Sequence, residues 1–155
     1  MKRRIGLLAA LAIVLSAGSV LLAQSNPFVG TWKLNLASSK YNPGPPPQSQ
    51  TRTWDASGTV MVTGVGATGK PFSYGYSITG DGKASPTTGA IPNKADMIST
   101  KKIDANTYEA KFTTAGKQVE TTTFTVSNGG KTLTIHAKGS PDAGFVENVQ
   151  VLDKQ

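Results

Sequence analysis

The sequence predicts an all-β fold, an antiparallel up-and-down β-barrel of about eight to ten strands. Apolar and polar residues alternate in one segment after another, and a period of two places every second side chain on the same face of a strand. Threonine, valine and aromatic residues, which favour strands, are plentiful. Clusters of Gly, Asn and Asp separate these segments at regular intervals. A sheet of this many strands has exposed edges, and closure into a barrel removes them.

Residues 1–23 have the order of a secretory signal peptide, which we expect to be helical. A positive cluster at residues 2–4 precedes an apolar run at residues 5–22, and Ala23 supplies a small residue at the expected cleavage point. An uncleaved anchor is the alternative, because 18 apolar residues reach the lower end of what spans a bilayer. After cleavage we expect one domain, residues 24–155, secreted or periplasmic, monomeric and without stable membrane insertion.

Composition argues against several classes of function. The leader holds three of the 16 basic residues and no acidic one, so the remaining chain carries 13 basic against 9 acidic residues, a net charge of +4. No basic run is longer than Lys101-Lys102, and nucleic-acid binding is therefore not expected. The lack of Cys rules out disulfides, thiol catalysis and zinc sites built on Cys. The single histidine cannot form a histidine metal cluster, and we expect neither metal nor cofactor.

The first predicted strand, residues 28–36, follows the leader and places Trp32 and Leu34 on one face. We expect Trp32 to be structural and to close one end of the barrel. The next segment, residues 37–48, contains Asn42-Pro43-Gly44-Pro45-Pro46-Pro47, which cannot form an α-helix. A polyproline-like loop is expected there.

Nine further strands are expected, joined alternately by tight hairpin turns and by longer loops. The turns at residues 56–58, 80–82, 104–106 and 128–130 contain Gly, Asn or Asp residues that tolerate positive φ, so each predicts a tight hairpin. They are every second connection, which places all four at one end of the barrel, the base. The longer connections, residues 37–48, 66–70, 89–94, 115–116 and 139–143, are expected at the other end, the rim. The nine strands are predicted at residues 49–56, 59–66, 71–79, 83–88, 95–103, 106–114, 117–127, 131–138 and 144–153.

The motif Phe28-x-Gly30-x-Trp32, followed by a meander of strands, resembles the opening of the lipocalin and fatty-acid-binding-protein superfamily. The chain after the leader is similar to the exported lipocalin-like proteins of bacteria. This resemblance implies a barrel whose Trp closes the base and whose cavity holds a small apolar ligand. The chain departs from the family in three places. The late Arg that packs over the Trp is missing, with Lys154 as a substitute; no helix follows the last predicted strand; and the Pro-rich segment replaces the helical lid of fatty-acid-binding proteins.

Three other features fit the pattern of strands and turns better than they fit catalysis or nucleotide binding. Residues 64–69 match G-x-G-x-x-G, but phosphate binding needs a following helix, and Pro71 begins an alternating strand instead. His136 alternates with apolar Ile135 and Ala137, which places it on the solvent side. The carboxylates at Asp81, Asp104 and Asp142 fall in predicted turns, where Asp bonds the local backbone. No catalytic residues are predicted.

Arg52 is the most distinctive polar residue of the predicted barrel. It shares parity with Trp54, so it faces inward if Trp54 does. An inward guanidinium among tyrosines could hold the carboxylate of an amphiphile by charge-assisted hydrogen bonds. Alternatively, Arg52 faces water or braces Trp54, since charged residues are mostly exposed.

The predicted function is noncovalent binding of a small hydrophobic or amphiphilic molecule in the barrel cavity, without enzyme activity. The alternative is a structural or protein-interaction barrel with a filled core that acts through its rim loops. The residues expected to line a ligand site are Arg52, Trp54, Phe72, Tyr74, Tyr76, Tyr108 and Phe112.

Overall fold

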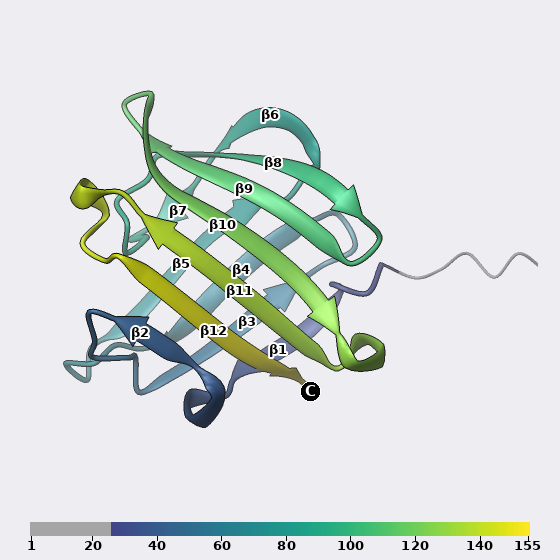
Figure 1. The fold of residues 1–155 in the computed structure, drawn as a ribbon, viewed down its shortest axis with the longest axis horizontal. Coiled ribbons are helices and arrows are strands. Elements are labelled where there is room, and N and C mark those ends of the chain that lie inside the picture. The colour runs from purple at the N-terminus through teal and green to yellow at the C-terminus, as the bar shows by residue number, and fades with distance from the viewer. Residues whose placement is uncertain (1–25) are drawn as a thin grey trace, which may run out of the picture.

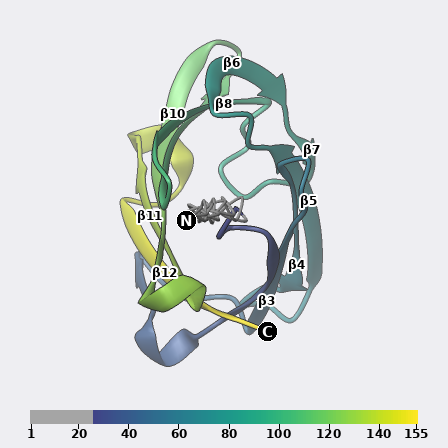
Figure 2. The ribbon, with the colours of Figure 1, turned by 90° about the vertical axis from the view of Figure 1, so that its right-hand side faces the viewer.

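The computed structural model describes residues 26–155, and the predicted leader, residues 1–23, lies outside this part of the chain. Twelve strands form one antiparallel sheet that curls into a nearly closed barrel, and the only helical segments of the described chain are three short 3₁₀ turns. Figure 1 shows the strands wrapping around the molecule, and Figure 2 shows them arranged around a ring. The predicted all-β antiparallel barrel is confirmed.

The strands are short and separated by turns of a few residues, as the sequence pattern indicates. In chain order the elements are β1 (Gly30–Leu34), η1 (Leu36–Ser38), β2 (Lys40–Asn42), β3 (Ser49–Trp54), β4 (Thr59–Val65), β5 (Pro71–Ser77), β6 (Asp81–Pro86), β7 (Thr88–Gly89), β8 (Met97–Asp104), β9 (Thr107–Thr114), β10 (Lys117–Ser127), η2 (Asn128–Gly130), β11 (Thr132–Gly139), η3 (Pro141–Ala143) and β12 (Glu147–Lys154).

Pairing of the first and last strands closes most of the ring. The sheet runs in the order β6-β8-β9-β10-β11-β12-β1-β3-β4-β5-β7, so β1 lies between β3 and β12. The registers place the turns that follow Trp54 and Ser127 at the base, where β1 also begins. The turns that follow Val65 and Thr114 lie at the rim. The two predicted ends of the barrel are therefore correct.

One predicted hairpin is wrong, and the barrel is open at that place. β5 and β6 follow one another in the chain, yet β6 pairs with β8 and not with β5. The chain crosses the seam at residues 78–80, because the Ile78 N–H donates to the Gly58 carbonyl at 2.8 Å and the Gly80 N–H donates to Thr100 Oγ1 at 2.9 Å. The predicted strand 83–88 is divided after Pro86, and its last part belongs to β7, which pairs back onto β5.

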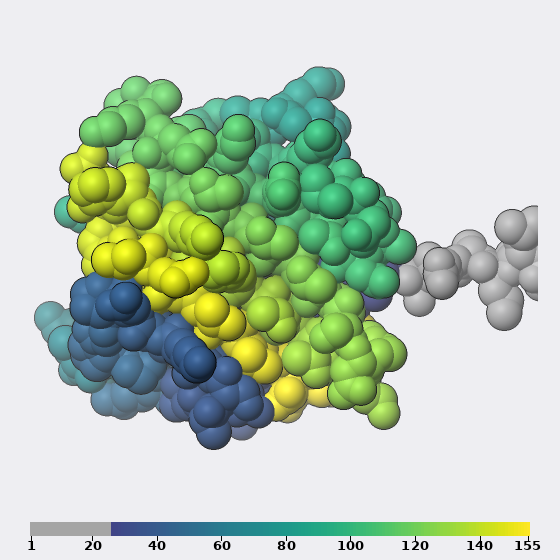
Figure 3. Space-filling view, viewed as in Figure 1, coloured from purple at the N-terminus to yellow at the C-terminus, as the bar shows by residue number. Residues whose placement is uncertain are grey.

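The structure adds one strand that the sequence did not predict. β2 lies within the segment expected to be a loop and pairs with the rim half of β12, with Tyr41 opposite Asn148. The Asn42 N–H donates to Asn148 Oδ1 at 3.1 Å and so reinforces this pairing. Figure 3 shows the blue β2 segment beside the yellow β12, with which it pairs in the same sheet.

The base of the barrel is closed around Trp32, which is fully buried. Its indole Nε1–H donates to the Phe28 carbonyl at 2.8 Å. Lys154 Nζ lies 4.9 Å from the centre of the Trp32 ring and donates to the Pro27 carbonyl at 3.2 Å. A Cβ on Gly30 would lie 2.8 Å from Lys154 Cε, so glycine leaves the path open for this lysine. Lys154 thus packs over Trp32, as expected for a substitute for the missing Arg.

Aromatic rings fill much of the interior between the base and the rim. Phe28 and Trp54 have ring centroids 4.6 Å apart, and Trp54 meets Phe124 edge-on at 5.9 Å. Nearer the rim, Tyr76 meets Phe112 edge-on at 5.6 Å. Such edge-to-face contacts add to the hydrophobic burial. The base half of the barrel is therefore solidly packed.

Candidate functional site

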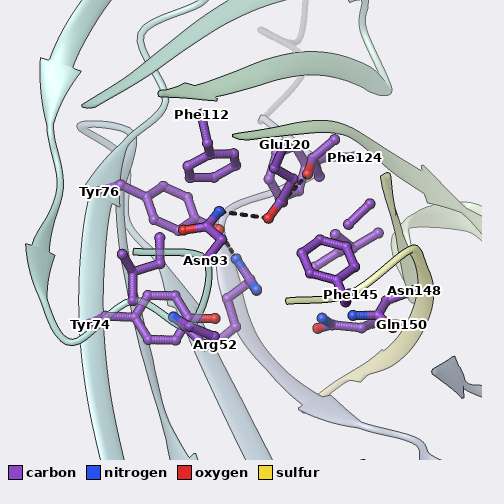
Figure 4. A pocket seen from close by; sticks show the side chains of 15 residues that line it. Arg52, Tyr74, Tyr76, Asn93, Phe112, Glu120, Phe124, Phe145, Asn148 and Gln150 are labelled. Carbon is purple, nitrogen blue, oxygen red and sulfur yellow. Dashed lines mark hydrogen bonds between the residues drawn. The ribbon is translucent and has the colours of Figure 1, made fainter. Parts of the chain in front are cut away.

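A cavity of about 90 Å³ lies in the barrel interior. Its walls come from strands β3, β5, β9, β10, β11 and β12, and the loop at residues 90–96 lies over it. Figure 4 shows aromatic rings around this space, with Tyr74 and Tyr76 across from Phe145, and polar side chains converging on it. The polar lining residues are Arg52, Tyr74, Tyr76, Asn93, Glu120, Thr122, Asn148 and Gln150.

Arg52 reaches the cavity because β3 alternates strictly between buried and more exposed residues, and Gln50, Arg52 and Trp54 all face inward. The Arg52 side chain is only 2% exposed. Its Nη1 donates to the Tyr76 hydroxyl, whereas its buried Nε has no hydrogen-bond partner among the described residues. The guanidinium carbon lies 5.7 Å from the centre of the Tyr76 ring and 5.9 Å from that of Phe124.

Arg52 is charged although it makes no direct ion pair within the described residues. The salt bridges within residues 26–155 are all at the surface, and none includes Arg52. Burial works against the charge, but Tyr76, Tyr74 and Glu120 together raise the pKa of Arg52, so the guanidinium stays protonated. Burial in turn raises the pKa of Tyr74, although Arg52 opposes the shift. Arg52 therefore carries its positive charge beside aromatic walls.

Glu120 is the acidic group of the cavity. Thr122 Oγ1 donates to one of its oxygens, and Asn93 Nδ2 donates to the other at 2.6 Å. Burial raises the pKa of Glu120, while the two hydrogen bonds and the Arg52 charge limit the shift. Glu120 and Arg52 therefore influence each other across the cavity without touching.

The loop at residues 90–96 inserts into the mouth of the barrel. Its alternate residues Ile91, Asn93 and Ala95 are all buried. Hydrogen bonds from the neighbouring strands hold it, since Thr87 Oγ1 donates to the Ala95 carbonyl at 2.6 Å and Thr114 Oγ1 donates to the Lys94 carbonyl at 3.0 Å. The loop places the Asn93 amide inside the cavity, with its oxygen accepting from the Ala95 N–H at 3.0 Å.

Two amides on β12 complete the polar lining on the side opposite Tyr74 and Tyr76 (Figure 4). Asn148 Oδ1 accepts from the Asn42 N–H, and Gln150 Oε1 accepts from Gln50 Nε2 at 2.9 Å. Both amide oxygens are thus occupied. The NH₂ groups of Asn148 and Gln150 make no other hydrogen bond within residues 26–155, so these two residues present donors.

The structure places the seven predicted ligand-site residues in two groups. Arg52, Tyr74, Tyr76 and Phe112 line the cavity. The other three lie outside it: Trp54 and Tyr108 pack near Phe28, and half-buried Phe72 stacks on Tyr74 at 6.0 Å. Arg52 faces inward, as its parity with Trp54 allowed, and the alternative that it faces water is wrong.

Sequence reasoning missed Asn93, Glu120, Asn148 and Gln150. Glu120 could have been found, because it shares parity with buried Thr122 and Phe124 on β10. Gln150 likewise shares parity with buried Leu152. Asn93 carries no such signal, since it lies in a loop without a period.

The other candidate motifs have structural roles. Residues 64–69 form the end of β4 and its turn into β5, closed by the Gly66 N–H donating to the Lys70 carbonyl at 2.8 Å. His136 is half-buried on the outer face, and its Nε2 lies 2.5 Å from Glu147 Oε1. In residues 26–155 no group of three His, Cys, Asp or Glu residues could hold a metal ion. The same part of the chain contains no helix long and apolar enough to cross a membrane.

A scan against models of protein families and a search of curated proteins found no match for this chain. The barrel is compatible with a lipocalin-like fold, and its buried aromatic cluster is compatible with a binding barrel.

Proposed function

We propose that this protein binds a small amphiphile whose anionic head lies against Arg52 in the cavity. The observation that carries the proposal is a guanidinium only 2% exposed, with one hydrogen bond, an unpaired Nε and no ion pair within the described chain. A buried charge without a direct counter-ion is unfavourable. An anion in the cavity would supply the missing partner through short, charge-assisted hydrogen bonds.

The remaining cavity walls suit the two parts of an amphiphile. Donors accompany Arg52, namely the Asn148 and Gln150 NH₂ groups and the Tyr74 hydroxyl, for which no partner is found within residues 26–155. The rings of Tyr76, Phe112 and Phe124 form an apolar wall. An oxyanion near the donors with carbon atoms against the rings would satisfy both surfaces.

The size of the cavity limits the ligand. Its volume of about 90 Å³ is below the roughly 150 Å³ of an engineered cavity that binds benzene. Only a head group of a few atoms fits, and a longer tail would have to leave through the mouth. We further propose that binding is noncovalent, that no catalysis accompanies it, and that a cleaved leader delivers the monomeric domain to the periplasm or the medium.

One observation favours the alternative function, a filled barrel that contacts a protein or cell-wall surface through its rim. The aromatic rings pack against each other, and the free volume is far below the roughly 300 Å³ at which ordinary ligand pockets begin. In that case the Pro-rich rim segment, residues 43–48, would be the contact surface.

The two functions differ in the response of Arg52 to a short carboxylate. We expect propionate to shift the Arg52 Nε–H signal in NMR spectra of the full chain, where only Arg3 and Arg4 contribute other arginine signals. Arg52→Met should abolish the binding heat measured by calorimetry, while Lys33→Met, which removes an exposed charge from neighbouring β1, should leave it unchanged. An unmoved Nε–H signal at saturating propionate would favour the filled barrel.

A further inference from the structure

Arg52 and Glu120 face the same cavity with opposite charges and still make no direct ion pair. Buried charges of opposite sign are normally paired. Both line the cavity, and Figure 4 shows them on two sides of it, with the Asn93 amide bonded to Glu120 and the Tyr76 hydroxyl bonded to Arg52. The arrangement suits a molecule that touches both groups.

The two sides of the cavity offer complementary chemistry. The side with Arg52 presents donors: the guanidinium and the amide NH₂ groups of Asn148 and Gln150. On the opposite side, Glu120 presents a carboxylate, which can accept about four hydrogen bonds. Thr122 and Asn93 supply two of these, so about two acceptor positions remain free.

Asn93 shows that the Glu120 carboxylate accepts a hydrogen bond from a donor inside the cavity. Its amide NH₂ enters the cavity and donates to Glu120 Oε2 at 2.6 Å. A hydroxyl or ammonium group on a ligand is a donor of the same kind. A ligand that carried only a carboxylate would satisfy Arg52 and leave the free positions of Glu120 unused.

We propose that the cavity selects a dipolar ligand, a short hydroxy or amino carboxylic acid whose carboxylate binds Arg52 and whose hydroxyl or ammonium group donates to Glu120. This inference rests on the proposed function and refines it from anionic molecules in general to one class. The volume of about 90 Å³ limits the part that is enclosed to a few non-hydrogen atoms. Glu120 is thereby a specificity-determining residue, because it distinguishes acids of equal size by the donor beside their carboxylate.

A series of three-carbon compounds tests this selection. Propionate, racemic lactate and racemic alanine share the carboxylate and differ in the neighbouring donor, whereas isopropylamine carries the cation alone. We expect calorimetry on the full chain to give dissociation constants at least tenfold lower for lactate or alanine than for propionate. Isopropylamine should not bind, because it lacks the group that Arg52 requires.

Glu120→Gln is the decisive variant. It should remove the tenfold preference, because lactate and alanine lose the acceptor beside their carboxylate and then bind no more tightly than propionate does to the same variant. The matched control is Glu109→Gln, which changes an exposed carboxylate on β9 and should retain the preference.

The outcomes separate the two proposals. If propionate binds as tightly as lactate and alanine, the dipolar selection is wrong and the anion site stands. If the preference survives in Glu120→Gln, Glu120 is not the residue that selects. If no carboxylate binds or moves the Arg52 Nε–H signal, water fills the space between the two charges, and the proposed function fails as well.

Discussion

At the scale of single residues, Arg52 and Glu120 are two buried ionisable groups in one cavity whose surroundings stabilise their charged forms to different degrees. Arg52 remains charged because aromatic faces, a tyrosine hydroxyl and a distant carboxylate stabilise it. Glu120 has fewer favourable neighbours, and burial raises its pKa. The carboxylate therefore weakens the folded state when it ionises, which makes it the residue through which pH acts on the interior.

The pH dependence of stability follows from this shift. The stability that Glu120 contributes is complete below its unfolded pKa of about 4.5 and is lost as the pH rises through the raised folded value. Glu120→Gln has no such loss, so its unfolding free energy should rise relative to the parent between pH 4 and pH 7. Each unit of pKa difference is worth about 1.4 kcal/mol.

Urea unfolding at four pH values measures this difference. The control Glu109→Gln should follow the parent, because Glu109 is exposed. A gap between Glu120→Gln and the parent that narrows toward pH 7 would contradict the account.

At the scale of elements, the loop at residues 90–96 fills the mouth of the barrel, and the hydrogen bonds of Asn93 help to hold it there. Replacing Asn93 by Ala removes its hydrogen bonds to Glu120 and to the Ala95 N–H. We expect the unfolding free energy to fall by about 1–3 kcal/mol, the usual effect of leaving a buried polar group unpaired.

The same loop supplies a control for the Asn93 variant. Lys94 is exposed, so Lys94→Ala should change the unfolding free energy by less than about 0.5 kcal/mol. Equal losses in Asn93→Ala and Lys94→Ala, measured by chemical denaturation, would show that the loop matters only as a backbone segment.

At the scale of the whole molecule, the barrel has one incomplete side. β6 is paired on one edge only and β7 has two residues, whereas β10 lies between two long partners. Amide hydrogens of β6 and β7 should exchange with deuterium well before those of β10, because exchange follows local opening. Hydrogen-exchange mass spectrometry of the full chain measures this order. Protection of residues 81–89 equal to that of residues 119–126 would mean that the seam is closed in solution.

The sequence indicated which side chains share a face of a strand, but it did not predict the contacts between residues far apart in the chain. Alternation correctly predicted most of the strands and the two ends of the barrel, and it left the side on which Arg52 lies open, because side-chain parity is a local property that gives only the relation of Arg52 to Trp54. It could not predict that β5 and β6 separate, since that depends on Gly58 and Thr100 accepting hydrogen bonds from the crossing chain. It also could not bring Asn93 to Glu120, because loops lack a period and these residues lie 27 positions apart.

The pairing of β1 with β12 determines when the molecule can finish folding. β1 lies between β3 and β12, and Trp32 on β1 lies opposite Lys154 on β12, which is far from it in the sequence. During synthesis β1 lacks this neighbour until β12 has been made, and until then Lys154 does not cover the Trp32 indole. Contacts of such high sequence separation form slowly. Ribosome-bound chains that stop before residue 147, where β12 begins, should therefore lack a closed base.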